Sequence, residues 1–146
     1  PHITLFVCGF LVEEDQYNDD FTQTQLDAQV QALGKANLPS FEIEIGGINS
    51  FASAPFLEIR DPEGGIPHLR GVLSRGAPEF RTAPYRPHLT LGLYADAFPS
   101  EKVLERMAAF SSEPLWWRVE RVSLARYRAK EIAGELSYEY EHWLKP

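Results

Sequence analysis

Cysteine, cationic side chains and long apolar runs are all scarce in this sequence of 146 residues. The one cysteine, Cys8, cannot form a disulfide within the chain, and we expect it to be a buried, unreactive thiol. No Cys/His spacing typical of a zinc site occurs. The absence of any run of about 18 apolar residues excludes a membrane-spanning helix. No signal-peptide pattern is present, so we expect a cytoplasmic protein.

Acidic side chains outnumber basic ones. The chain carries 21 Asp and Glu residues against 14 Lys and Arg residues, a formal net charge of −7. This balance argues against a broad surface for duplex nucleic acid, but it is compatible with a local site for a small anion or an RNA end. We therefore expect nucleotide or oligonucleotide substrates rather than a tRNA-sized one. No membrane partner is expected, and we expect a monomer.

Apolar residues are plentiful enough to build a folded core. Hydrophobic residues make up 44% of the chain and aromatic residues 12%, which excludes a disordered protein. We expect residues 1–146 to form a single, two-lobed domain. The first residue is Pro1 rather than methionine. This is compatible both with a natural start after methionine removal and with a trimmed chain that lacks an upstream strand.

The apolar periodicity predicts an α+β fold with largely antiparallel sheets. Apolar or alternating runs predict strands at residues 2–12, 41–52, 56–60, 87–95, about 115–128 and 135–144. Helical spacing predicts helices at residues 21–36, 66–76 and from Ser100 through Phe110. Asp20 is the predicted cap of the first helix, and Asn37-Leu38-Pro39 is its predicted stop. The pair Gly46-Gly47 predicts a bulge or bend in the strand at 41–52.

A five-residue pattern occurs twice, as Pro-His-Ile-Thr-Leu at residues 1–5 and as Pro-His-Leu-Thr-Leu at residues 87–91. One His-x-Thr alone means little, but two copies inside a five-residue match are hard to attribute to chance. Both copies open a predicted strand. The repeat is therefore the best candidate for a functional site.

Strand geometry gives the repeated spacing a chemical meaning. Alternate side chains of a strand share a face, so His2 and Thr4 would point one way while Ile3 and Leu5 point into the core. The same alternation applies to the second copy, at His88 and Thr90. Residues two apart on a strand are separated by roughly 6.5–7 Å. An imidazole and a hydroxyl at that spacing can reach different oxygens of one phosphoryl group.

The repeat, with a helix and strands after each copy, resembles the two-histidine (2H) phosphoesterase superfamily, which includes the LigT-like 2′-5′ RNA ligases that act as RNA 2′,3′-cyclic phosphodiesterases. The segment 41–60, the stretch Tyr85-Arg86-Pro87 and the strand end Leu124-Ala125-Arg126-Tyr127 are also similar to this family. The resemblance implies a bilobal, pseudo-symmetric fold, with two mainly antiparallel sheets flanked by helices around a central cleft.

The sequence departs from the family pattern in two places. Family members usually have a further strand and helix before the first motif, which this sequence does not show. Many also carry a basic residue just after the second motif, where this chain has Leu93. The second departure leaves one expected phosphate contact unassigned.

The resemblance implies a metal-independent, cofactor-free phosphodiesterase that hydrolyses 2′,3′-cyclic phosphates of RNA ends or nucleotides to 2′-phosphates. In-line attack needs a base and an acid on opposite sides of the phosphorus, and histidine can fill either role near neutral pH. We assign His88 as the general base and His2 as the general acid, although pseudo-symmetry leaves the two roles interchangeable. Thr4 and Thr90 would hold the equatorial oxygens as their charge grows.

Three further residues are substrate-binding candidates. Tyr127 occupies a family position near the cleft and would stack on a base, or it is a half-buried strand tyrosine. Arg126 would offset charge near the phosphate, or it is solvated at a strand edge. Phe51 is either a stacking platform or part of the core. Two alternatives to hydrolysis stay open: a non-catalytic nucleotide-binding module on the same fold, and 2′-5′ RNA ligation as a side activity.

Overall fold

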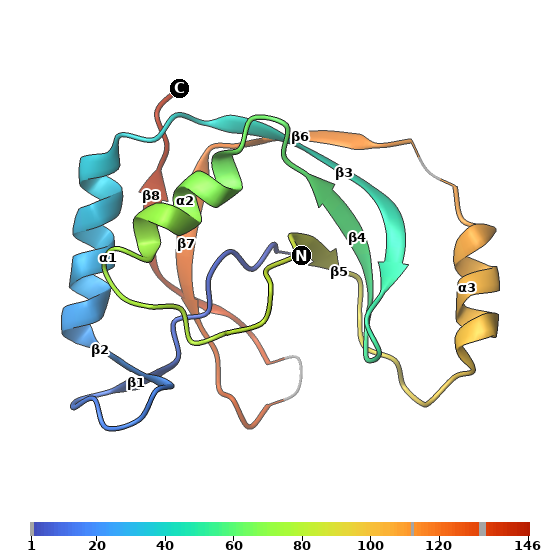
Figure 1. Ribbon diagram of the computed structural model, residues 1–146, viewed down its shortest axis with the longest axis horizontal. Helices are drawn as coiled ribbons and strands as arrows, with labels where there is room; N and C mark the ends of the chain where they lie inside the picture. The colour runs from blue at the N-terminus through green and yellow to red at the C-terminus, as the bar shows by residue number, and fades with distance from the viewer. Residues whose placement is uncertain (1, 112, 132–133) are drawn as a thin grey trace.

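The computed structural model describes residues 2–111, 113–131 and 134–146, so Pro1 of the first motif lies outside the described residues. Within these residues the elements follow the order β1 (Phe10–Val12), β2 (Asp20–Thr22), α1 (Gln23–Ala36), β3 (Phe41–Ser50), β4 (Pro55–Arg60), α2 (Gly65–Leu73), β5 (His88–Thr90), α3 (Ser100–Ala108), β6 (Leu115–Val119), β7 (Arg121–Arg126) and β8 (Ser137–Trp143). Helices and mainly antiparallel strands are mixed along the chain, which confirms the predicted α+β class (Figure 1).

The largest sheet has the strand order β5-β4-β3-β6, and each neighbouring pair is antiparallel. The register between β3 and β4 shifts between Gly46 and Ile48, which confirms the predicted bulge. Gly47 has a φ of 73° at this point, a backbone conformation that residues with a Cβ rarely adopt. The bulge therefore depends on glycine.

The region predicted as one strand at 115–128 is two strands in different sheets. β6 pairs with β3, whereas β7 pairs with β8 in a separate two-stranded antiparallel sheet. Glu120 separates them, and its carbonyl oxygen accepts a hydrogen bond from the Leu144 amide at 2.8 Å. The segment predicted as one strand thus contributes strands to two sheets, which lie on opposite sides of the molecule (Figure 1). An alternating pattern cannot show where a chain changes its partner strand.

Helix α1 begins at a different cap from the predicted one. Thr22 is the N-cap, and its hydroxyl accepts from the backbone amide of Gln25, while the Gln25 side chain accepts from the Thr22 amide. This is a capping box, which satisfies two amides that the first helical turn leaves free. Asp20 instead accepts hydrogen bonds from the amides of Gln16 and Tyr17 in the preceding loop. The helix ends at Asn37 in a left-handed conformation, at the predicted stop.

The core lies where α1 and α2 meet β3, β4 and the C-terminal end of β8. Its buried residues are Leu33, Leu38, Phe41, Ile43, Ile59, Ile66, Leu69, Val72 and Leu144. Helix α3 lies on the far side of the large sheet (Figure 1) and buries none of its residues. Among the described helices, none combines the length and the apolar run that a membrane crossing requires.

Candidate active site

The second motif lies in a strand, as predicted. His88 and Thr90 belong to β5, where His88 stands opposite Glu58 of β4 and Thr90 stands opposite Phe56. The strand is shorter than the predicted 87–95, because β4 begins at Pro55 and leaves the following residues without a partner strand. Leu91 still donates its amide to the Pro55 carbonyl at 3.0 Å. The motif is therefore anchored to the sheet by backbone pairing.

The backbone of Arg86 orients the His88 ring. His88 Nδ1 lies 2.7 Å from the Arg86 carbonyl oxygen. Because a carbonyl oxygen can only accept, Nδ1 carries the hydrogen of this bond. In the neutral imidazole this leaves Nε2 as the nitrogen with a free lone pair. On the side that faces away from the Arg86 carbonyl, the ring thus presents Nε2 as a proton acceptor.

Two phenylalanines support the His88 ring. Phe56 is completely buried, and the Phe51 ring stacks on it with a centroid distance of 4.2 Å. His88 meets both rings edge-on, at 4.9 Å from Phe51 and 5.4 Å from Phe56. Phe51 remains 39% exposed. The structure therefore places Phe51 at the surface beside the second motif, stacked on the buried Phe56.

A carboxylate, a guanidinium and an amide gather next to His88. Arg86 forms an ion pair with Glu58, and its Cζ lies 5.2 Å above the centre of the Phe56 ring. The Asn49 side chain donates to Glu58 at 2.8 Å. The Asn49 hydrogen bond and the Arg86 ion pair lower the pKa of Glu58. Glu58 is therefore a carboxylate at neutral pH, and it faces the same side of the sheet as His88.

The first motif differs from the prediction, because residues 2–9 form no strand. Only Phe10–Val12 of the predicted strand at 2–12 is regular, and it pairs in parallel with β2. The predicted alternation nevertheless holds in part, because Ile3 and Leu5 pack against the core. His2 is exposed and Thr4 is half-buried. A strand needs a neighbour to pair with, and no strand of the described chain pairs with this segment.

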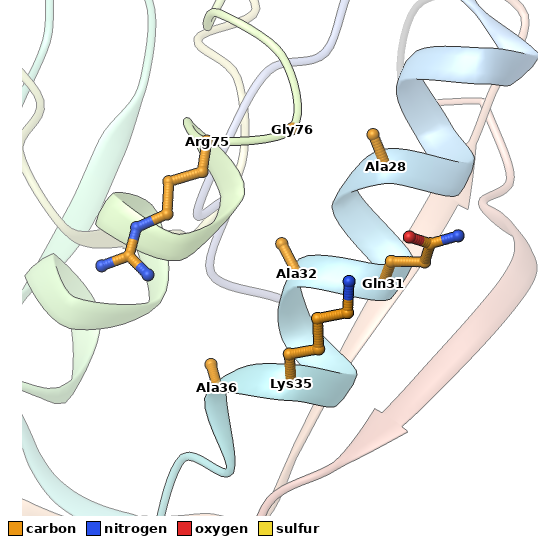
Figure 2. Close-up of a pocket in the computed structure, with 7 residues that line it drawn as sticks. All are labelled: Ala28, Gln31, Ala32, Lys35, Ala36, Arg75 and Gly76. Atoms are coloured by element: carbon orange, nitrogen blue, oxygen red, sulfur yellow. The ribbon is translucent and has the colours of Figure 1, made fainter.

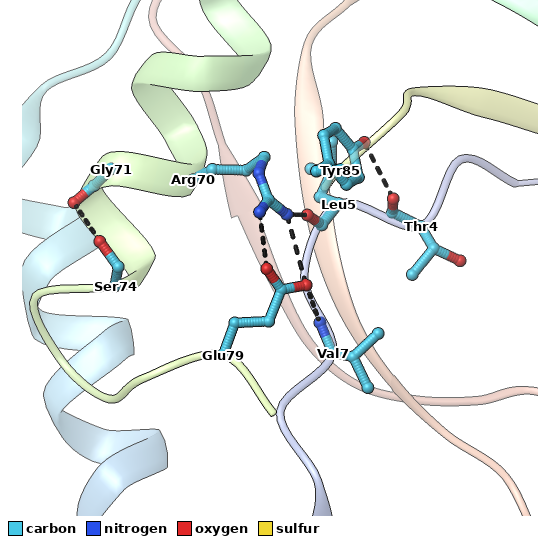
Figure 3. Close-up of polar contacts among 8 residues, drawn as sticks. All are labelled: Thr4, Leu5, Val7, Arg70, Gly71, Ser74, Glu79 and Tyr85. Carbon is cyan, nitrogen blue, oxygen red and sulfur yellow. Dashed lines mark hydrogen bonds and ion pairs between the residues drawn. The ribbon is translucent and has the colours of Figure 1, made fainter. Parts of the chain in front are cut away.

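Side chains from elsewhere bind the backbone of this segment instead (Figure 3). Arg70 of α2 donates to the Leu5 carbonyl and forms an ion pair with Glu79 at 2.6 Å. Glu79 in turn accepts from the Val7 amide at 3.1 Å. The Arg70 guanidinium also lies 3.8 Å from the centre of the Tyr85 ring. We call Arg70, Glu79 and Tyr85 the clamp.

The clamp brings the two motif segments together. The Tyr85 hydroxyl donates to the Thr4 carbonyl at 3.0 Å, and Tyr85 lies only three residues before His88. Tyr85 and Leu89 pack against the same core that holds Ile3 and Leu5. The segments that carry the two copies of the motif are therefore neighbours in space.

The other two substrate-binding candidates lie on the β7–β8 hairpin. Arg126 ends β7 and forms an ion pair with Glu139 of β8 at 3.0 Å. Tyr127 follows it and is exposed. Within the described residues, neither side chain forms a hydrogen bond, an ion pair or a ring contact with His88. The structure thus does not join them to the cluster around the second motif.

Cys8 and the hollows of the surface lie apart from the second motif. Burial raises the pKa of the Cys8 thiol to about 11, in line with the inert thiol that the sequence predicts. A hollow of about 310 Å³ lies between α1 and the end of α2 (Figure 2), where Ala28, Ala32 and Ala36 are too small to fill it. In the ranges 2–111, 113–131 and 134–146, no three His, Cys, Asp or Glu side chains are grouped to hold a metal ion.

Comparison with known proteins decides the family. The model of the 2′-5′ RNA ligase superfamily matches residues 1–131. The chain belongs to this superfamily. E. coli LigT in its apo form shares the fold at a TM-score of 0.64 and 18% identity, over 99% of this chain and 76% of LigT. A protein described as a phosphoesterase gives a TM-score of 0.63 and 15% identity, over 99% and 77% of the two chains.

The structure of E. coli LigT with 3′-AMP also matches, at a TM-score of 0.60 and 17% identity, over 85% of this chain and 71% of LigT. A search of curated proteins gave no match. The predicted kinship with LigT-like 2H phosphoesterases and the predicted fold class are confirmed by the family match and these folds.

Six residues around the two His-x-Thr motifs were not among the site residues predicted from the sequence: Arg70, Glu79, Tyr85, Arg86, Glu58 and Asn49. Tyr85 and Arg86 precede the second motif directly, and that position was a usable signal. Glu58 lies two residues after Phe56 on one strand, so their side chains are expected to share a face. This spacing does not predict that His88 lies opposite Glu58. No sequence pattern pointed to Arg70 and Glu79, because their contacts depend on where α2 and the following loop meet the first motif.

Proposed function

We propose that this member of the superfamily hydrolyses 2′,3′-cyclic phosphates, at RNA ends or in free nucleotides, to 2′-phosphates. The observation that carries the proposal is the hydrogen bond from Tyr85 to Thr4, which joins the first motif to the segment that leads into the second. The E. coli LigT structures, described as complexes with 3′-AMP and with ATP, support a nucleotide as the ligand class.

In the proposed reaction, one imidazole from each motif moves a proton. Water attacks the phosphorus and gives its proton to Nε2 of His88, the nitrogen that the Arg86 carbonyl leaves free. The bond between phosphorus and the 3′ oxygen breaks, and His2 donates a proton to that oxygen. The products are a 2′-phosphate and a 3′ hydroxyl. The hydroxyls of Thr4 and Thr90 donate to the non-bridging oxygens as their charge grows.

The test is hydrolysis of adenosine 2′,3′-cyclic phosphate, with the product isomers separated by chromatography. We expect adenosine 2′-phosphate alone, at a rate that excess chelator does not change and that depends on pH as a bell. Replacing His2 or His88 by Ala should lower kcat by a factor of about 10² or more, the usual cost of losing one acid–base group. Replacing Thr4 or Thr90 should cost less, because a hydroxyl stabilises charge without moving the essential proton.

His68→Ala is the matched control, since this exposed histidine lies on α2. Histidine variants that equal the wild type, or activity lost on chelation, would overturn the mechanism. A wild-type protein that binds adenosine 2′-phosphate but turns over no cyclic phosphate would instead support the non-catalytic nucleotide-binding module. Joining of RNA ends without hydrolysis would support the ligase alternative.

A further inference from the structure

Arg86 provides a cation beside the second motif. Residues 91–101, which follow the motif, include no Lys or Arg, and the next cationic residue is Lys102. Arg86 lies on the other side of the motif in sequence. Its guanidinium and the His88 ring contact the same Phe56 ring, at 5.2 Å and 5.4 Å from its centre.

Arg86 is also held by a group that an anionic ligand can replace. Its partner Glu58 stands directly opposite His88 in the sheet and is a carboxylate at neutral pH. The pair is largely exposed, with 52% of the Arg86 side chain and 38% of the Glu58 side chain accessible to water. An exposed ion pair is weak, so a phosphoryl group can compete for the guanidinium. Arginine suits this exchange because its donors match carboxylate and phosphate oxygens equally well.

We infer that Arg86 is the residue that binds the substrate's phosphoryl group at the second motif, and that Glu58 occupies it when no substrate is bound. This inference rests on the proposed function. Glu58 is then a competitor of the ligand, because it neutralises Arg86 and repels the phosphoryl charge. A purely structural ion pair would behave differently, since loss of either partner would disturb the site in the same direction.

The experiment is calorimetric titration with adenosine 2′-phosphate and, separately, with adenosine, which lacks the phosphoryl group. Arg86→Gln should weaken binding of adenosine 2′-phosphate about tenfold, the usual size of a lost charge-assisted hydrogen bond, and leave adenosine binding unchanged. Glu58→Gln should tighten binding of adenosine 2′-phosphate several-fold. Glutamine keeps an acceptor oxygen for Asn49 and Arg86 but removes the repelling charge.

Arg121→Gln is the matched control, because Arg121 is a similarly exposed arginine that pairs with Glu141 at 3.2 Å on the separate β7–β8 hairpin. It should bind adenosine 2′-phosphate as the wild type does. In turnover, Arg86→Gln should raise KM for the cyclic phosphate and change kcat little, and Arg86→Lys should restore part of the affinity. The lysine variant also keeps the test decisive if the glutamine variant unfolds.

Opposite signs for Arg86→Gln and Glu58→Gln support the inference. An Arg86→Gln variant that binds adenosine 2′-phosphate like the wild type would overturn it, and so would weaker binding in both variants. Binding and turnover by the wild type distinguish a failure of this inference from a failure of the proposed function. If the wild type neither binds the nucleotide nor cleaves the cyclic phosphate, the proposed function falls and the inference falls with it.

Discussion

The second motif, at His88 to Thr90, forms an edge strand whose backbone pairs with β4, whereas the first motif, with nearly the same residues, forms no strand. Both segments pack apolar residues on the same core, at Leu89 in one case and at Ile3 and Leu5 in the other. The difference lies in their neighbours. A β-strand is a paired structure, so identical local sequence yields a strand only where a partner presents its backbone.

The first motif shows how a segment without a partner strand is held. Its amide and carbonyl groups still need hydrogen bonds, because burying them unpaired is costly. Arg70, Glu79 and Tyr85 supply these bonds from α2 and the loop that follows it (Figure 3). The position of the first motif therefore depends on three side chains, while that of the second depends on a sheet. Substitutions should affect the two motifs unequally.

The largest effect is expected from breaking the clamp with Arg70→Met. The substitution leaves the half-buried Glu79 carboxylate without its cation and the Leu5 carbonyl without its donor. We expect the free energy of unfolding to fall by about 2 kcal/mol, less than for a fully buried pair. Denaturant titration measures this loss. Hydrogen exchange should speed up at the Val7 and Phe80 amides, which bond within this region.

Arg75→Met is the control for that experiment, because Arg75 is an exposed arginine just beyond α2 (Figure 2). It should leave both stability and exchange at Val7 unchanged. If Arg70→Met behaved like this control, the first motif would be held by its apolar packing alone, and the contrast between the two motifs would disappear.

A smaller effect is expected in the sheet that carries the second motif, from Gly47→Ala. Alanine at a φ of 73° is strained, so the substitution should destabilise the protein by about 1 kcal/mol. Exchange at the Val7 amide should change no more than global stability requires, because the bulge lies between β3 and β4, whereas Val7 bonds to Glu79 and Phe80. Gly34→Ala is the control: Gly34 lies in α1 with open space around it, so alanine should stabilise the helix. Equal destabilisation by both substitutions would contradict the role of the bulge.

The smallest effect, and the most specific, is expected from Tyr85→Phe. This change removes only the hydrogen bond to the Thr4 carbonyl, which should cost about 0.5 kcal/mol. Burial raises the pKa of Tyr85 to about 12, so the hydroxyl stays protonated in the folded protein above its ordinary pKa. Stability from this group is therefore complete below pH 10, the ordinary value, and is lost as the pH rises from about 10 to about 12.

Unfolding free energies of the wild type and Tyr85→Phe, compared between pH 8 and 12, test this prediction, because the other tyrosines cancel in the difference. The advantage of the wild type should be constant at first and then shrink above pH 10. Tyr127→Phe, at an exposed tyrosine, should show no such change. A difference that is independent of pH up to 12 would mean that the Tyr85 hydroxyl is not buried against Thr4.

Predictions that rest on local chemistry agree with the structure. The end of α1 at Asn37 agrees with the stop predicted from Asn37-Leu38-Pro39, because the residue before a proline rarely stays helical. The bulge agrees with the one predicted from Gly46-Gly47. The cap of α1 was misplaced by two residues, because Asp20 and Thr22 are both good caps and only the capping box with Gln25 selects Thr22. Local rules thus locate the helix well and its first residue less well.

The strands predicted at 41–52, 56–60 and 135–144 are present, whereas two strand predictions were wrong because a partner strand was absent or changed. Residues 2–9 have the apolar, β-branched composition of a strand, but no strand in the described part of the chain pairs with them. Residues 115–128 have the alternation of one strand but are divided at Glu120 between two sheets. In both cases the composition correctly indicated a propensity to form strands. It did not indicate which distant segment would pair with the backbone.

The α+β class, the family and the two His-x-Thr motifs can be read from the amino-acid sequence, because a repeated pattern of chemical groups is visible without coordinates. The surroundings of the motifs depend on the tertiary structure. Glu58 stands opposite His88 through the register of β4 and β5, Arg86 reaches Phe56 through the same sheet, and Arg70 meets Leu5 through the packing of α2. These contacts join residues that are far apart in the chain, and pairing register and packing create such contacts only when the whole chain folds.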